Sequence, residues 1–410
     1  MKPQKFKQTE IGKIPEDWEE GELVNHLDLL KDGTHNPPKR VNKGIKFIAG
    51  ASDLTYRNID FSKCTFITEE EYNKLHKFYK LKEGDILLTI VGTVGNVAII
   101  QKEDLPFSLQ RSIAILRPKK GLNNNYLFYL ITSSIFRNQL FSKINPTAQP
   151  GIYLGELGKI RITFPKDPKE QLSIASILSS LDEKIELNNK MNKTLEAIGQ
   201  IIFKKWFIDE KKEEWKVSII GKELKTILGG TPDRTKPEYW NGNINWINSG
   251  KVNEFRIISP SEKITKKGLD KSTTSLLPKG TVVLAITGAT LGQVSILEID
   301  SCANQSVVGI LEDKNFSSEF IYYLIKNNID DLIGFQTGGA QQHINKGNID
   351  SYTFTIPDNP TLKKFNDIIK PIFEQISNNC FQNQTLSSIR DALLPKLMSG
   401  EIRVPVENGK

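Results

Sequence analysis

IASILSSLDEKIELNNKMNKTLEAIGQIIFKKW, residues 174–206, decides how the rest of the sequence is interpreted. Apolar residues recur in it at alternating intervals of four and three, the heptad spacing of a helix that packs along another helix. The seam comprises Ile174, Leu178, Leu181, Ile185, Asn188, Asn192, Leu195, Gly199, Ile202 and Trp206. Two asparagines thus stand at the centre of an apolar stripe, where a buried amide lowers stability but restricts the register of pairing.

A second seam of the same kind occupies residues 365–397, near the C-terminus. It comprises Phe365, Ile369, Ile372, Ile376, Asn379, Asn383, Leu386, Arg390, Leu393 and Leu397. Reversing one helix against the other brings Asn188 beside Asn383 and Asn192 beside Asn379. We therefore expect the helices to pair as an antiparallel coiled coil whose register these asparagines set. The alternative is two amphipathic helices that pack separately on their own domains, with the asparagines exposed.

The sequence that precedes each seam belongs to an internal repeat, the signature of a duplicated architecture. Trp18 matches Trp215, 197 residues later. ILLTIVGTVGNVAII (86–100) matches VVLAITGATLGQVSIL (282–297), 196 residues later, and LQRSIAIL (109–116) matches NQSVVGIL (304–311), 195 residues later. Pro165 matches Pro357, 192 residues later. The offset declines in small steps, as insertions and deletions in loops would produce.

Each half begins with a mixed α/β domain and ends in a long helix. Short β-branched runs at 86–91 and 282–286 predict strands, and residues 126–141 and 318–333 predict helices. The expected fold class is α+β, with a pseudo-twofold internal repeat. The predicted limits are 1–165 for the first domain, 166–211 for the first helix, 212–357 for the second domain, and 358–410 for the second helix and tail.

Composition restricts the class of protein without defining it. The 410 residues include 55 Lys and Arg against 48 Asp and Glu, a net charge of +7 that permits a nucleic-acid partner without requiring one. The three cysteines, Cys64, Cys302 and Cys380, are an odd and sparse set, which argues against a disulfide framework. No run of 18 apolar residues occurs, so we expect no membrane span and a cytoplasmic location.

Motifs for catalysis are almost absent. The sequence contains neither G-x-x-x-x-G-K-[ST] nor G-x-G-x-x-G, and its four histidines form no paired motif, so we expect no cofactor and no metal. Asn36-Pro-Pro-Lys39 resembles the N-P-P-aromatic motif of adenine N6-methyltransferases, in which the aromatic ring stacks on a flipped base. Lys39 cannot stack in that way, and a stand-alone enzyme has only this motif in its favour.

Polar residues stand at matching places of the two halves. Gln110-Arg111 and Asn304-Gln305 each follow a predicted strand, and such side chains read adenine and guanine edges. The Thr–Gly turns at 89–95 and 286–292 could bring hydroxyl and N–H groups to phosphates, although a tight β-turn explains them equally well. Polar loops also match at 147–151 and 337–343. Basic residues at 39–40 and 234–236 could touch phosphates or simply be solvated.

Several motifs resemble the specificity (S) subunits of type I restriction-modification systems. TEIGKIPEDW (9–18) resembles their N-terminal signature, and LMSGEIR (397–403) is similar to the end of their C-terminal helix. KDGTH (31–35) resembles the start of one common target-recognition domain. GGTPDRTKPEYWNG (229–242), followed by INSG (247–250), resembles another. The resemblance covers nearly the whole chain and its organisation in two halves.

This resemblance implies two target-recognition domains that each read one half of a bipartite, asymmetric site on double-stranded DNA. The two helices between them set the gap. It also implies a chain without chemistry of its own. Modification (methyltransferase) subunits bind S-adenosylmethionine and methylate adenine, and restriction subunits use ATP and Mg²⁺ to translocate and cut DNA. A protein scaffold with a coiled-coil spacer is the alternative, favoured if exposed aromatic patches replaced the polar loops.

The polar loops, the Thr–Gly turns, the basic stretches and the KDGTH segment supply the candidate DNA contacts, because the residues that touch bases in the family vary with the target and are not carried over. The candidate contacts are Thr34, His35, Lys39, Arg40, Thr93, Gln110, Arg111, Gln149, Arg234, Lys236, Thr290, Asn304, Gln305, Thr337, Gln341 and Gln342.

Overall fold

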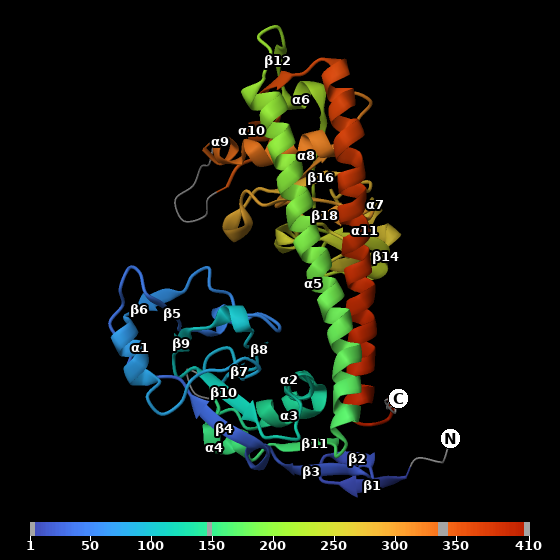
Figure 1. Cartoon of the computed structure of the whole chain (residues 1–410). Coiled ribbons are helices and arrows are strands. Elements are labelled where there is room, and N and C mark those ends of the chain that lie inside the picture. The colour runs from blue at the N-terminus through green and yellow to red at the C-terminus, as the bar shows by residue number, and fades with distance from the viewer. Residues whose placement is uncertain (1–4, 146–149, 335–342, 406–410) are drawn as a thin grey trace. The chain divides into compact units, whose positions relative to one another are not determined.

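The computed structural model describes residues 5–145, 150–334 and 343–405. The chain divides into two units (Figure 1): unit 1 joins Met1–Lys184 to Leu386–Lys410, and unit 2 is Ile185–Thr385. The division cuts across both long helices rather than at their ends. It therefore does not test the domain limits expected from the sequence, which stay a prediction.

Unit 1 is a mixed α/β structure. Its strands are β1 (Phe6–Thr9), β2 (Gly12–Pro15), β3 (Trp18–Glu22), β4 (Leu27–Asp32), β5 (Ile45–Ile48), β6 (Thr65–Ile67), β7 (Ile86–Thr89), β8 (Val97–Ile99), β9 (Phe107–Leu109), β10 (Ile113–Pro118) and β11 (Arg161–Pro165). Its helices are α1 (Glu69–Leu75), α2 (Asn124–Thr132), α3 (Ser134–Ser142), α4 (Leu154–Gly158), and parts of α5 (Pro168–Lys204) and α11 (Asn359–Met398). An antiparallel sheet of order β4-β10-β7-β8 forms its centre, and β6-β5-β9 forms a second sheet.

The central strand β7 is buried on both faces, which explains its continuous apolar run. Ile86 and Leu88 face a core that includes the apolar side chains of α2. Leu87 faces the opposite core, together with Phe107 and Leu109 of the second sheet. The sheet is thus a middle layer between a helix and another sheet.

Unit 2 repeats this arrangement. Its strands are β12 (Lys216–Ile219), β13 (Lys225–Leu228), β14 (Trp240–Ile247), β15 (Glu262–Ile264), β16 (Val282–Ala285), β17 (Val294–Ile296), β18 (Cys302–Ala303), β19 (Val307–Leu311) and β20 (Thr353–Ile356). Its shorter helices are α6 (Ile220–Glu223), α7 (Lys266–Asp270), α8 (Ser318–Asn327), α9 (Ile329–Gly334) and α10 (Lys346–Asp350). The sheets have the orders β13-β19-β16-β17 and β15-β14-β18, which match those of unit 1 strand for strand. The expectation of two mixed α/β domains from an internal repeat is confirmed.

The helices predicted at 126–141 and 318–333 are each divided in two. Ser133 separates α2 from α3, because its backbone is extended and its hydroxyl caps the N–H of Phe136. Asn328 likewise stands between α8 and α9. A serine inside an apolar pattern also serves as an N-cap, and the periodicity does not distinguish the two uses.

The long helices carry the heptad seams. Helix α5 ends in a π-helical turn, Lys205–Asp209, and α11 continues through Pro371 to Met398. All seam residues are buried or half-buried. In unit 2, Asn188 donates to Asn383 Oδ1 at 2.8 Å, and Asn379 donates to Asn192 Oδ1 at 2.8 Å. Residue numbers rise along one helix as they fall along the other, so the helices are antiparallel there.

The amides of the two helices form a connected set. Asn188 also donates to Gln382 Oε1, and Asn383 donates to Asn189 Oδ1, both at 2.8 Å. Asn192 and Asn379 are 3% and 4% exposed, so the hydrogen bond between them has little competition from water. The pairs are those that reversal of one seam brings together, and their role in setting the register stays a prediction.

Replacing one amide of the inner pair should cost more than replacing both. Asn379→Leu leaves the buried Oδ1 of Asn192 without its hydrogen-bond donor, and we expect a loss of about 1–3 kcal/mol in the free energy of unfolding. Asn192→Leu with Asn379→Leu removes both polar groups and should restore at least the original stability. Chemical denaturation measures the free energy of unfolding of each variant. Lys193→Leu, on the exposed face of α5, controls for the effect of leucine on helix propensity. A double variant less stable than either single variant would contradict this account.

Candidate nucleic-acid interface

In unit 1 the segment after β4 passes close to the loop between β9 and β10. The N–H of Thr34 donates to Leu109 O at 3.0 Å, and the N–H of Arg111 donates to Thr34 O at 3.1 Å. Gly33 permits this approach, since a Cβ there would lie 2.2 Å from Leu109 O. We call this contact, residues 33–34 against 109–111, the loop crossing of unit 1. It brings together three of the predicted DNA contacts, Thr34, Gln110 and Arg111.

Unit 2 has an equivalent loop crossing, residues 229–231 against 303–305. The N–H of Gly230 donates to Ala303 O at 2.8 Å, and a Cβ on Gly229 would lie 2.1 Å from Asn304 O. The Thr231 hydroxyl donates to Gln305 Oε1 at 2.5 Å. Both predicted contacts of this region, Asn304 and Gln305, lie at the second crossing. Gln305 is exposed and Asn304 is half-buried.

Backbone hydrogen bonds correct the alignment of these loops by one residue. The N–H of Gln110 donates to Ile48 O, and the N–H of Asn304 donates to the corresponding Ile247 O. Ile113 and Val307 then donate to the carbonyls of Gln110 and Asn304, respectively. The true offset is 194 rather than 195, so Gln110 corresponds to Asn304 and Arg111 to Gln305. The 195-residue offset was wrong because it paired two identical glutamines.

A cavity of about 260 Å³ adjoins the loop crossing of unit 1. Thr34 and His35 line it, together with Lys31, Tyr79 and Ser108. The Thr34 hydroxyl donates to Asn36 O at 2.8 Å, and His35 Nε2 lies 2.8 Å from Asp32 Oδ2. Sequence reasoning missed Tyr79 and Ser108, which reach this cavity from distant parts of the chain. In the sequence these two residues stand out only as polar side chains near apolar strands. That feature is too common to identify them as site residues.

The two predicted arginines outside the crossings lie against aromatic rings. The Arg40 guanidinium lies 3.8 Å from the Phe47 ring centre, and burial lowers the pKa of Arg40. The Arg234 guanidinium lies 3.7 Å from the Trp240 ring centre and donates to Glu262 Oε2 at 2.6 Å. Stacking holds a guanidinium plane in place while its edge stays able to bond a phosphate or a base.

The remaining candidates are dispersed. Lys39 is exposed, and Lys236 Nζ lies 3.8 Å from Asp233 Oδ2. Thr93 is exposed, whereas the Thr290 hydroxyl donates to Thr287 O within its own turn at 3.2 Å. Four further candidates lie outside the described residues: Gln149, Thr337, Gln341 and Gln342. All the predicted DNA contacts stay predictions.

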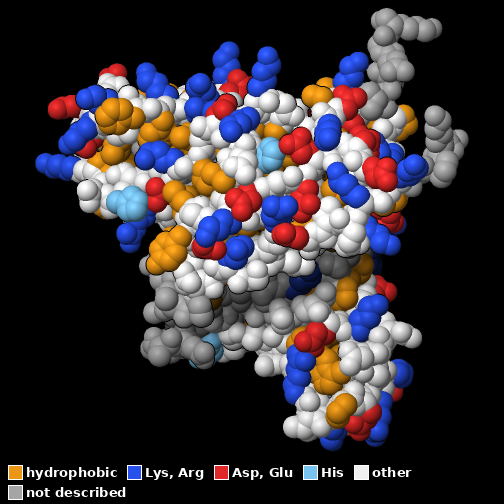
Figure 2. All heavy atoms as spheres, turned by 90° about the horizontal axis from the view of Figure 1, so that it is seen from below, with side chains coloured by type: hydrophobic (Ala, Val, Ile, Leu, Met, Phe, Trp, Pro, Cys, Tyr) orange, Lys and Arg blue, Asp and Glu red, His pale blue; other side chains and the backbone are white. Residues whose placement is uncertain are grey.

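The charges on the face shown in Figure 2 are mixed. Lys and Arg side chains are spread among Asp and Glu, with apolar side chains between them, rather than gathered into a stripe of one sign. A mixed surface of this kind gives a weaker non-specific attraction to DNA than a uniformly basic one.

The described part of the chain comprises residues 5–145, 150–334 and 343–405. No helix there is long and apolar enough to cross a membrane. No group of three or more His, Cys, Asp or Glu side chains there is arranged to hold a metal ion.

Known proteins resemble this chain over most of its length. The family described as type I restriction modification DNA specificity domain matches it twice, at residues 15–197 and 212–387. The type I restriction enzyme MjaIX specificity subunit of Methanocaldococcus jannaschii is 28% identical, covering 97% of this chain and 96% of that protein. The HindI specificity subunit of Haemophilus influenzae is 22% identical, covering 78% of this chain and 87% of that protein.

The fold has a solved counterpart. The S subunit of the type I restriction-modification system of M. genitalium superposes with a TM-score of 0.61 at 16% sequence identity, covering 93% of this chain and 96% of that one. At this identity the likeness bears on the fold alone. The two family matches, one for each half of the internal repeat, together span most of the sequence. The chain therefore belongs to the type I restriction-modification DNA specificity family.

Proposed function

We propose that this chain is the DNA-recognition subunit of a type I restriction-modification complex. Each unit reads one half of a bipartite target on double-stranded DNA. The observation that carries the proposal is the repeated loop crossing, which presents polar side chains on the same backbone framework in both units. Side chains with both donors and acceptors, held on a rigid turn, suit the reading of base edges.

The two crossings carry different side chains, which supports an asymmetric target. Gln110 and Arg111 of unit 1 stand where unit 2 has Asn304 and Gln305. Arginine binds guanine in a bidentate manner, whereas asparagine and glutamine bind adenine. We therefore expect the half-site that unit 1 reads to include a guanine. The half-site that unit 2 reads should favour adenine.

The proposal assigns the chemistry to partner subunits in the cytoplasm. Modification subunits would supply S-adenosylmethionine and methylate adenine, and restriction subunits would supply ATP-driven translocation and cleavage with Mg²⁺. This chain would contribute the target sequence and, through α5 and α11, the gap between half-sites. The antiparallel amide pairs support a fixed gap, because sliding one helix along the other would separate them.

Substitutions at the crossings should alter one half-site each. In a modification complex reconstituted with Arg111→Ala, we expect discrimination at one position of the first half-site to fall by about 1–3 kcal/mol. Gln305→Ala should relax the second half-site only. Methylation rates on DNA with single base changes in either half measure both effects, and Lys159→Ala provides a surface control. An equal loss of rate on every substrate, with base preference unchanged, would contradict the assignment.

Lengthening both helices together should lengthen the gap. Residues 189–195 of α5 face residues 376–382 of α11, as the flanking Asn188–Asn383 pair shows. Duplicating both heptads in tandem adds roughly 10 Å of helix, or about 3 base pairs. We expect methylation of a site whose half-sites are unchanged and whose gap is longer by that amount. Duplicating only one heptad is the control and should abolish activity. An unchanged gap in the double duplication would refute the spacer role.

A further inference from the structure

An aromatic–arginine dipeptide occurs at a similar place in both units. Tyr56-Arg57 follows the 3₁₀ turn Ala51–Asp53, and Phe255-Arg256 follows the 3₁₀ turn Ser249–Asn253, 199 residues later. In each unit the arginine extends from the globular part towards acidic residues of α5. None of the candidate DNA contacts belongs to this pair of loops.

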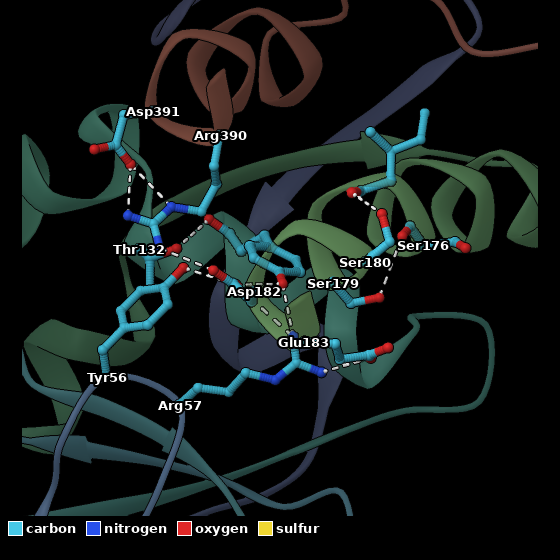
Figure 3. A network of polar contacts seen from close by, with 12 residues as sticks. Tyr56, Arg57, Thr132, Ser176, Ser179, Ser180, Asp182, Glu183, Arg390 and Asp391 are labelled. Atoms are coloured by element: carbon cyan, nitrogen blue, oxygen red, sulfur yellow. Dashed lines mark hydrogen bonds and ion pairs between the residues drawn. The ribbon is translucent and has the colours of Figure 1, made fainter. Parts of the chain in front are cut away.

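In unit 1 four segments meet at one carboxylate (Figure 3). Asp182 of α5, with a side chain 5% exposed, accepts hydrogen bonds from the hydroxyls of Tyr129 at 2.6 Å and Tyr56 at 3.2 Å. Arg390 of α11 donates to its other oxygen at 2.8 Å. Arg57 donates to the Tyr129 hydroxyl at 2.8 Å and lies 3.8 Å from Asp182. The loop, α2 and both long helices are thereby joined.

The protonation of this cluster favours the observed bonds. Burial, together with the bond to Asp182 and its charge, raises the pKa of Tyr129 well above its usual range. Burial and the charge of Asp182 raise the pKa of Tyr56 in the same way. Both hydroxyls therefore stay protonated and donate to the carboxylate.

Arg57 also has an unusual backbone conformation. Its φ is +70°, in the left-handed region that side chains with a Cβ rarely occupy. Its N–H donates to Val97 O at 3.0 Å, and its carbonyl accepts from the N–H of Ile99 at 3.2 Å. Such a conformation persists only where surrounding bonds determine it, so the direction of the Arg57 side chain is closely specified.

Unit 2 uses different residues for the same kind of connection. The Arg256 side chain is fully buried and lies 4.8 Å from the ring centres of both Tyr322 of α8 and Phe373 of α11. It lies 3.4 Å from Glu196 of α5. Glu196 also accepts from the Tyr322 hydroxyl at 2.8 Å and from Lys326 at 2.6 Å. The loop and α8 are again joined to both long helices at a buried charge.

Directional bonds of this kind restrict rotation in a way that apolar contacts do not. Apolar side chains can repack against a helix after a small rotation at modest cost. A buried charge that loses its partner is strongly destabilising, so a rotation that separates the arginine from its acid is opposed. The clusters therefore specify the angle between each globular part and the helix that it contacts.

We infer that Arg57 and Arg256 are positioning residues, which hold the globular part of each unit, with its loop crossing, at a defined angle to α5 and thereby restrict the gap that the protein accepts. The inference rests on the proposed function, because a gap has meaning only if each unit reads a half-site. It assigns a role in specificity to residues that touch no base.

The test uses the reconstituted modification complex and DNA whose correct half-sites are separated by the native gap or by gaps one or two base pairs longer or shorter. The unit 1 variants are Arg57→Ala and Asp182→Asn. We expect their methylation rates at gaps changed by one base pair to rise about tenfold relative to the native gap, with base preference in both half-sites unchanged. Arg57→Lys keeps the charge but not the planar fork, and should give an intermediate profile.

Tyr129→Phe removes one hydroxyl and keeps the ring. It provides a milder variant if thermal melting shows that the other variants do not fold. Glu156→Gln disrupts an exposed pair with Lys159 within unit 1 and is the matched control, with no expected change in gap profile. A folded Tyr129→Phe or Arg57→Lys complex whose rates fall equally at all gaps would overturn the inference. If the wild-type complex ignores half-site sequence, the proposed function itself fails, which is a separate result.

Discussion

The structure depends on the pairing of amides between α5 and α11. Leucine and isoleucine seams tolerate several registers of similar energy, because one apolar contact replaces another. Buried amides do not, since each wrong register leaves hydrogen-bonding groups without partners. In unit 2, Asn188 bonds Asn383 and Asn192 bonds Asn379, an arrangement that only one antiparallel register permits. We expect these amides to restrict the register of the helix pair on which the globular parts pack.

On these helices the same architecture occurs twice with different surfaces. Both units place a four-stranded sheet between a helix and a second sheet, and both bring a glycine against the loop that precedes β10 or β19. The backbone at this crossing is common to the two units, whereas Arg111 of one corresponds to Gln305 of the other. A conserved framework with exchangeable side chains allows a target to change without a change of fold.

Much of this could be predicted from the sequence, because the seams and the repeat are periodic signals. Interactions without a period were missed. Asp182 and Arg390 are 208 residues apart and form an ion pair, and no motif or periodic pattern in the sequence connects the two residues. The loop alignment was wrong by one residue because identical glutamines outweighed a backbone pattern that only the structure reveals. The division at Ser133 was missed because a serine fits both a helix interior and an N-cap.

The central claim is that this chain selects where a partner enzyme methylates DNA. The most direct measurement is a map of adenine methylation across the source genome, with the gene intact and with it deleted while the modification subunit is still produced. The account predicts that deletion removes methylation from a single bipartite motif with unequal halves and a constant gap. Methylation that persists at every motif after deletion, in cells that made an active complex before it, would contradict the account.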